Sequence, residues 1–203
     1  MPNTNVELSK NELELVTNSE FILTKNRIVE KVYNLFGMLS EEYRSILNAN
    51  ALHLPKEIFN MPAKIYKGEQ YKNLPYVMLD YPRIFSKDDV FAIRNFFWWG
   101  NFFSITLQLQ GKYLQHYQHN ILRYFNKEKN SDWFIGMSDS AWEHHFENDN
   151  YVLLSDVLIN SSAKNILEKN FIKLAKKMEL EKWNEAENFF RDNYYEIMKM
   201  LKA

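Results

Sequence analysis

The chain has 203 residues, 46% of them hydrophobic, so it is long enough to bury one substantial core without disulfides or a structural metal. Lys and Arg total 25 against 26 for Asp and Glu, giving a formal net charge of -1 and no overall field that attracts nucleic acid or a membrane surface. With Cys 0, thiolate catalysis and cysteine-bound metal centres are excluded. The polar, acidic start is unlike a signal peptide, so we expect a cytoplasmic protein.

Residues 1–55 are predicted to be helical. Ser9 and Glu12 have the spacing of a capping box, which predicts a short first helix. From Phe21 onward apolar residues recur at helical spacing, and Ser40 is typical of a fresh helix start. The helical region is expected to end before the next proline.

Residues 60–155 are predicted to form a sheet with inserted helices. Prolines and a glycine punctuate two short apolar runs, residues 64–67 and 76–81, which indicate antiparallel strands. A serine followed by two aspartates then predicts a helix over residues 86–99. Residues 103–110 alternate between apolar and polar side chains, which is the pattern of a strand with one dry face and one polar face.

A helix is predicted for residues 112–125, and weaker patterns suggest strands at residues 133–136, 142–146 and 151–154. Residues 160–203 are expected to be helical, with Ser162 capping a helix that carries Leu167, Phe171, Leu174 and Met178, and with a final amphipathic helix. The whole chain, residues 1–203, is therefore predicted to be a single α+β domain. Its central antiparallel sheet of roughly four to six strands would be flanked by N-terminal and C-terminal helices.

Two charged residues fall where apolar ones are expected. Arg94 lies on the apolar face of the helix predicted for residues 86–99, and Asp80 lies in the apolar strand before it. A buried guanidinium requires a counterion, so Asp80 is the expected partner and Arg83 is its competitor. Such a pair either ties strand to helix or holds a carboxylate or phosphate ligand.

The second alternative defines a candidate binding site. If the polar side chains of residues 103–110 are covered rather than exposed, their hydroxyl and amide groups need partners, and a polar ligand is one such partner. The residues expected to contact a ligand are Tyr76, Asp80, Tyr81, Arg83, Arg94, Trp98, Thr106 and Gln108.

The opposite side of the same predicted helix carries Phe96 and Trp99. An aromatic face of this kind is either enclosed by the terminal helices or covered by a partner, which leaves a homodimer interface as an open alternative. No basic residues are interleaved among these aromatics, so nucleic-acid binding is not expected. The uncharged residues 95–110 are interrupted by amides and by Gly100, so no membrane span is expected.

Histidines form two clusters. His116 and His119 share a helix face with Lys112 and Arg123, which indicates a solvated basic face or, alternatively, a small anion site. Neighbouring cations disfavour a metal there, and no metal site is predicted anywhere.

Glu143, His144 and His145 lie in a predicted strand, where the two imidazoles would point to opposite faces and could not chelate one ion. Glu143 and His145 would share a face and could act as an acid/base pair. No nucleotide-binding, hydrolase or metalloprotease motif is present, and no cofactor is predicted.

The blocks LPYVMLDYPR, AIRNFFWWG and SITLQLQG resemble a set of small uncharacterised bacterial proteins over about the middle third of the chain. The resemblance implies a stand-alone bacterial protein and assigns no activity to any residue. Three functions remain open. The leading one is a binding protein for a small anionic or polar ligand or for a partner protein. The alternatives are a hydrolase or isomerase that uses Asp80, Glu143 and His145 with an arginine clamp, and an interaction or immunity-type module.

Overall fold

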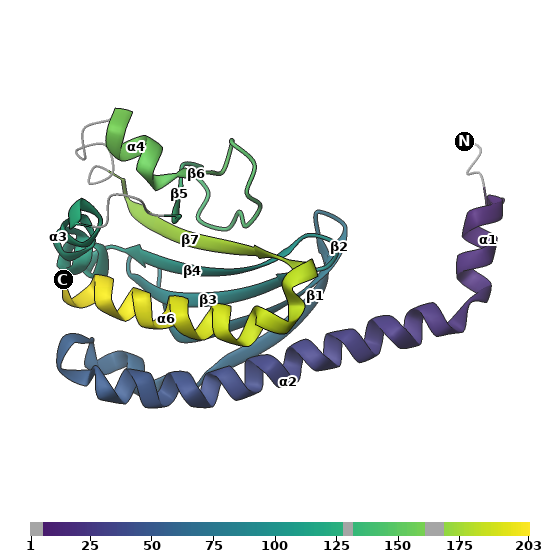
Figure 1. The fold of residues 1–203 in the computed structure, drawn as a ribbon, viewed down its shortest axis with the longest axis horizontal. Helices are drawn as coiled ribbons and strands as arrows, with labels where there is room; N and C mark the ends of the chain where they lie inside the picture. The colour runs from purple at the N-terminus through teal and green to yellow at the C-terminus, as the bar shows by residue number, and fades with distance from the viewer. Residues whose placement is uncertain (1–5, 128–131, 161–168) are drawn as a thin grey trace.

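A seven-stranded antiparallel sheet forms the centre of an α+β fold in the computed structural model (Figure 1). The structure describes residues 6–127, 132–160 and 169–203. The strands are β1 Lys64–Tyr71, β2 Leu74–Phe85, β3 Val90–Trp98, β4 Phe102–Gln110, β5 Phe134–Gly136, β6 Tyr151–Leu153 and β7 Phe171–Glu179. Their order in the sheet is β1-β2-β3-β4-β7-β5-β6, and each neighbouring pair is antiparallel.

Helices stand at both ends of the described chain, as predicted. They are α1 Lys10–Thr17, α2 Ser19–Ala49, α3 Lys112–Lys127, α4 Leu154–Asn160 and α6 Ala186–Lys202, with short 3-10 turns η1 Ala51–His53, η2 Lys56–Asn60 and η3 Leu180–Glu185. The capping box at Ser9 is confirmed. The fresh start predicted at Ser40 is wrong, because the Ser40 hydroxyl donates to the Gly37 carbonyl at 2.8 Å and α2 continues through it.

The main core lies between one face of the sheet and the helices α2 and α6, which run across it (Figure 1). Tyr43 of α2 and Tyr194 of α6 stack with ring centroids 3.7 Å apart. The Asn95 amide nitrogen of β3 donates to the Tyr43 hydroxyl at 2.8 Å, while its Oδ1 has no hydrogen-bond partner among the described residues. Phe103 of β4 contacts Phe190 and thus ties the sheet to α6.

The helix predicted for residues 86–99 is wrong, because most of that segment is strand β3. All nine residues of β3 are buried, since both faces of this central strand are covered. The sequence of a strand that is buried on both sides is a continuous apolar run. Periodicity alone does not distinguish such a run from a buried helix. Gly100, with φ +71°, lies in the tight turn that joins β3 to β4. The aromatic helix face, for which a homodimer interface was left open, does not exist, and Phe96 is buried in β3.

The helix expected to carry Phe171, Leu174 and Met178 is also wrong, because these residues belong to β7. Ser162 and Leu167 lie outside the described residues. In β7 the even-numbered Ile172 and Leu174 face the helices while Lys173 and Ala175 face the other way. Together with the confirmed strands β5 and β6, β7 brings the sheet to seven strands, one more than the upper limit expected.

The second face of the sheet is covered by the loop of residues 137–150, which connects β5 to β6 (Figure 1). The strand predicted at residues 142–146 is wrong, since this segment belongs to that loop. Phe146 of the loop contacts Phe102 of β4 and stacks on Tyr151 at the start of β6. Hydrogen bonds from Met137 N to Asn150 O and from Tyr151 N to Glu147 O close the loop on itself. Among the described helices, none combines the length and apolar character that crossing a bilayer requires.

Replacing Phe103 by alanine tests the packing of the sheet against α6. We expect the free energy of unfolding to fall by about 3–5 kcal/mol, because a fully buried ring is lost from a close-packed layer. Met38→Ala is the matched control, since Met38 is exposed and its loss should change stability by less than about 0.5 kcal/mol. Urea denaturation measures both, and equal effects would contradict this packing.

Candidate functional site

Asp80 and Arg94 form a buried ion pair across β2 and β3, where they are direct cross-strand neighbours. Arg94 Nε donates to Asp80 Oδ1 at 2.7 Å and Nη2 donates to Oδ2 at 2.9 Å. Asp80 is only 3% exposed and Arg94 only 6% exposed. Tyr66 also donates to Asp80 Oδ2, at 3.2 Å. The bidentate geometry satisfies the carboxylate and leaves part of the guanidinium free for other acceptors.

The loop of residues 137–150 supplies the cover over this pair. His144 Nε2 lies 3.3 Å from Arg94 Nη1, and because a guanidinium only donates, the imidazole nitrogen accepts. Burial, with a smaller contribution from the Arg94 charge, holds the pKa of His144 well below its usual range, so the ring is neutral. The rings of Phe85 and Trp142 lie 5.7 and 5.9 Å from the guanidinium carbon.

The polar row of β4 lies beneath the same loop and is buried, not exposed to solvent. Thr106 stands opposite Arg94, and Gln108 stands opposite Lys173 of β7. Gln108 is 4% exposed, and its Nε2 has no hydrogen-bond partner within the described residues. Burying an amide N–H without an acceptor costs free energy, so the site lacks one hydrogen-bond acceptor at this atom.

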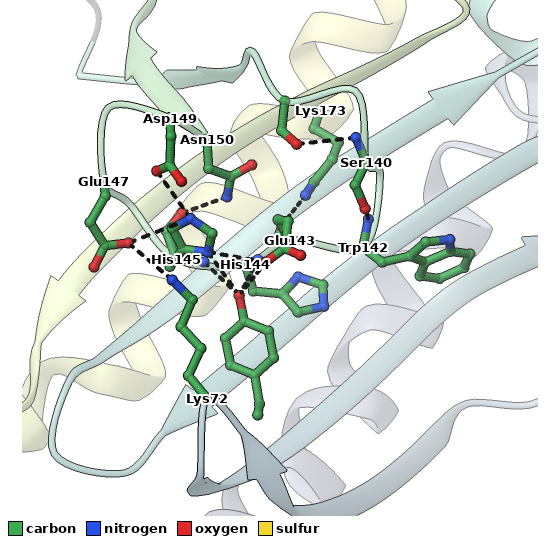
Figure 2. Close-up of polar contacts among 12 residues, drawn as sticks. Lys72, Ser140, Trp142, Glu143, His144, His145, Glu147, Asp149, Asn150 and Lys173 are labelled. Atoms are coloured by element: carbon green, nitrogen blue, oxygen red, sulfur yellow. Dashed lines mark hydrogen bonds and ion pairs between the residues drawn. The ribbon is translucent and has the colours of Figure 1, made fainter.

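Lys173 is the functional candidate that the sequence analysis missed. The residue is 1% exposed, and its Nζ donates to the backbone carbonyl of Glu143 in the covering loop (Figure 2). Burial, reinforced by the nearby Arg94 charge, lowers the pKa of Lys173 to about 7. A Cβ at Gly136 would lie 3.1 Å from the Lys173 Cβ, so glycine permits β5 to approach the lysine closely. The alternation of apolar and polar side chains in residues 171–178 could have indicated this strand. Because the segment was predicted to be a helix, Lys173 was not assigned to a buried face.

A second polar group is built around Tyr71 at the edge of the loop. Its hydroxyl oxygen accepts the backbone N–H groups of His144 at 2.7 Å and His145 at 3.1 Å. The same hydroxyl lies 3.3 Å from a Glu143 carboxylate oxygen and 3.1 Å from His145 Nδ1. His145 and Glu143 are 3.2 Å apart, so the expected proximity of this acid/base pair is present. Figure 2 shows that His144 and His145 diverge, although they lie in a loop and not in a strand.

Within the described part of the chain, one set of His, Asp and Glu side chains lies close enough together to bind a metal ion. The nearest ligand atoms of His145, Glu147 and Asp149 all lie within 4.8 Å of one another. However, both carboxylates are exposed, and the His145 ring nitrogens already face Glu143 on one side and Asp149 on the other. Contacts with the Glu143 and Asp149 carboxylates occupy both His145 ring nitrogens without an ion, so we assign no metal here.

The remaining predicted residues are not gathered at Arg94. Tyr81 lies in the core on the helix side of the sheet, because neighbouring strand residues face opposite ways. Arg83 donates from Nε to the Pro62 carbonyl at 3.1 Å and is not the partner of Asp80. Trp98 belongs to an aromatic cluster, and Tyr76 packs at its border. Tyr76 and Tyr81 therefore cannot flank one ligand.

The site that the structure assembles is consequently smaller than the predicted one and partly different. It consists of a polar layer between the sheet and the loop of residues 137–150. This polar layer comprises Asp80, Arg94, Thr106, Gln108, His144 and Lys173.

Comparisons with known proteins add nothing to this geometry: no family model matches the chain, and no curated protein or solved structure shows significant similarity to it. The resemblance of its middle third to small bacterial proteins therefore stays a prediction.

The energetics of the ion pair can be measured with a double-mutant cycle. Arg94→Met should lower the free energy of unfolding by about 3–5 kcal/mol, because it leaves the Asp80 carboxylate buried without a counterion. The double variant Asp80→Leu with Arg94→Met should be more stable than Arg94→Met alone, since no isolated charge remains. Chemical denaturation provides the values. Strictly additive effects would show that the two side chains do not interact.

The buried lysine gives stability a defined pH dependence. Because the pKa of folded Lys173 is about 7, below its ordinary 10.5, unfolding takes up a proton between these values and stability rises with pH. From about pH 7.5 to 9.5 the slope should approach about 1.4 kcal/mol per pH unit. Lys173→Met should reduce this slope, with a remainder from Lys169, whose pKa is also lowered by burial. Lys127→Met, at an exposed position, should leave the slope unchanged, and an unaltered slope in Lys173→Met would refute this assignment.

Proposed function

We propose that this protein binds a small anionic ligand, such as a carboxylate, within the polar layer between the sheet and the loop of residues 137–150. The observation that carries the proposal is a surplus of buried hydrogen-bond donors in this layer. We further propose that it is a bacterial cytoplasmic protein, which agrees with its resemblance to small bacterial proteins and with Cys 0.

The donor surplus follows from the contacts of three side chains. A guanidinium has five N–H groups, and those of Arg94 that have partners point to Asp80 and His144. Lys173 donates to one backbone carbonyl, and Gln108 Nε2 has no acceptor among the described residues. Asp80 is the one carboxylate of the layer, and both its oxygens are occupied. A ligand carboxylate would supply the missing acceptor oxygens.

Access to the layer depends on the covering loop. Residues 137–150 are held by two three-residue strands and contain no helix or strand of their own. Trp142 in this loop is 58% exposed and lies against Phe85, which is also exposed at the border of the layer. Displacement of such a loop does not require the sheet to unfold, so an open state can admit a ligand.

Two substitutions separate binding from stability. Gln108→Leu removes the unpartnered amide, so it should keep or raise the stability of the ligand-free protein while weakening ligand binding. Lys173→Met should weaken anion binding at least about tenfold. Gln115→Leu, an exposed glutamine of α3, is the matched control and should change neither.

The measurement combines native mass spectrometry of protein purified without added ligand and calorimetric titration with succinate and citrate. A bound small molecule, or heat of binding at one site per chain that Lys173→Met reduces, would support the proposal. A bare mass together with no heat from either anion would refute it, as would unchanged binding in both Lys173→Met and Gln108→Leu.

The alternative is a hydrolase or isomerase of small anions. It is favoured by one observation, the 3.2 Å contact of His145 with Glu143 beside the Arg94 layer. Asp80 is a poor base in this scheme, because Arg94 and Tyr66 occupy its carboxylate, so Glu143 and His145 would transfer the proton. Conversion of a bound anion by the wild type, lost in Glu143→Gln with binding retained, would select this alternative.

A further inference from the structure

Residues 6–23, here called the arm, project away from the rest of the molecule (Figure 1). The arm contains α1, which has no buried residue, and the first turn of α2. Its large apolar side chains are 46–83% exposed. They are Val6, Leu8, Leu13, Leu15, Val16, Phe21, Ile22 and Leu23.

Such an arm is not expected to be stable by itself. An eight-residue helix is too short to persist in water without tertiary contacts, because nucleation costs more than so few hydrogen bonds return. A dense group of exposed apolar side chains on a soluble surface marks a contact with another surface. Within the described residues, α2 begins to be buried only at Val29.

A complementary surface lies at the opposite end of the molecule. A pocket of about 550 Å³ is formed by η1, the start of α3 and the end of α6. Its apolar lining includes Leu54, Tyr113, Tyr117 and Leu201, and Leu52 beside them is 97% exposed. The lining also includes two lysines, Lys112 and Lys202, and two histidines, His53 and His116. The pocket thus combines an apolar floor with a rim whose cations are Lys112 and Lys202, and Glu57, paired with Lys112 at 3.2 Å, is the one acid among its described lining residues.

The arm carries the opposite charge. Glu7, Glu12, Glu14 and Glu20 lie in it against one cation, Lys10. Apolar side chains beside carboxylates match a pocket of apolar side chains beside cations. From this complementarity we propose that the arm of one copy of this chain docks into the η1–α3–α6 pocket of a second copy.

The geometry requires a second copy and suggests a closed dimer. The arm lies at the N-terminal end of α2, whereas the pocket follows its C-terminal end, and α2 is 31 residues or about 46 Å long. The arm therefore cannot reach the pocket of its own chain (Figure 1). Two copies with antiparallel α2 helices place each arm at the other's pocket, and this reciprocal exchange closes with twofold symmetry.

The exposed histidine cluster gains an explanation from this arrangement. His116 and Lys112 line the pocket, whereas His119 does not, and Arg123 donates to the Ala203 carbonyl at 3.2 Å. The basic face of α3 is therefore divided between the docking pocket and the contact with the end of α6. Glu7 and Glu14 of the incoming arm supply the anionic groups for the rim.

Light scattering on a sizing column, with sedimentation to obtain the dissociation constant, tests the dimer. The wild type should be a dimer at about micromolar concentration. Leu13→Asp with Val16→Asp should raise the dissociation constant at least about a hundredfold, because two apolar contacts are lost and two carboxylates would have to leave water on docking. Leu153→Asp, an exposed position on β6, is the control and should remain dimeric. A wild-type monomer at all concentrations would overturn the proposal.

Charge reversal tests where the arm docks. Glu7→Lys with Glu14→Lys leaves the Ser9–Glu12 capping box intact, and His116→Glu with Lys202→Glu leaves the Lys112–Glu57 pair intact. Each double variant alone should be mainly monomeric, since like charges meet in both interfaces. An equimolar mixture should restore a heterodimer, because a reversed arm then meets a reversed pocket and a native arm meets a native pocket. Variants that stay dimeric alone, or a mixture that stays monomeric, would exclude this pocket as the docking site.

Discussion

The bidentate contact between Asp80 and Arg94 determines how the second face of the sheet must be built. Two opposite charges taken out of water are tolerated only if their remaining donors and acceptors are also satisfied. Tyr66 from β1 and His144 from the covering loop meet part of that requirement, so elements distant in the chain are drawn to one place. The loop of residues 137–150 is thereby held over the sheet by polar contacts as well as by Phe146, and the polar layer exists because the ion pair exists.

The two faces of the sheet consequently differ in physical character. The face under α2 and α6 is a mainly apolar core with stacked rings, into which β3 sends one amide, Asn95, whose nitrogen donates to Tyr43. The face under the loop holds a charged pair, a lysine with a lowered pKa and an amide without a partner. A fold that only needed stability would not keep these groups, because apolar replacements of similar shape are often as stable. Their presence on one face makes that face the place where specificity for a ligand would arise.

Sequence patterns were informative where one face of an element carries apolar side chains and the other carries polar ones. The alternation of residues 103–110, the apolar stripe of α3 and the capping box at Ser9 are all confirmed in the structure. They failed for β3, a central strand covered on both sides, because the contrast that reveals a period is missing there. In β7 the alternation was present, but its apolar residues were interpreted as one face of a helix. The pairing of Asp80 with Arg94 was still predictable, because burial of a charge demands a counterion whatever the local structure. Lys173 was not predictable as a site residue, since its position depends on β7 lying beside β4.

The unequal covers of the sheet also shape how the molecule moves. The apolar core is covered by two long helices, α2 and α6, whereas the polar layer is covered by the fourteen-residue loop 137–150. This loop is anchored at its two ends on the three-residue strands β5 and β6. Opening this loop admits water to the ion pair while α2 and α6 keep their contacts with the sheet. Amide hydrogen exchange of residues 137–150 is then governed by this partial opening, whereas the slowest-exchanging amides are expected in the paired strands β4 and β7 and in the helices packed on the sheet. The buried charge of Arg94 thus marks the boundary between the loop that opens locally and the helix-packed part of the protein that stays closed.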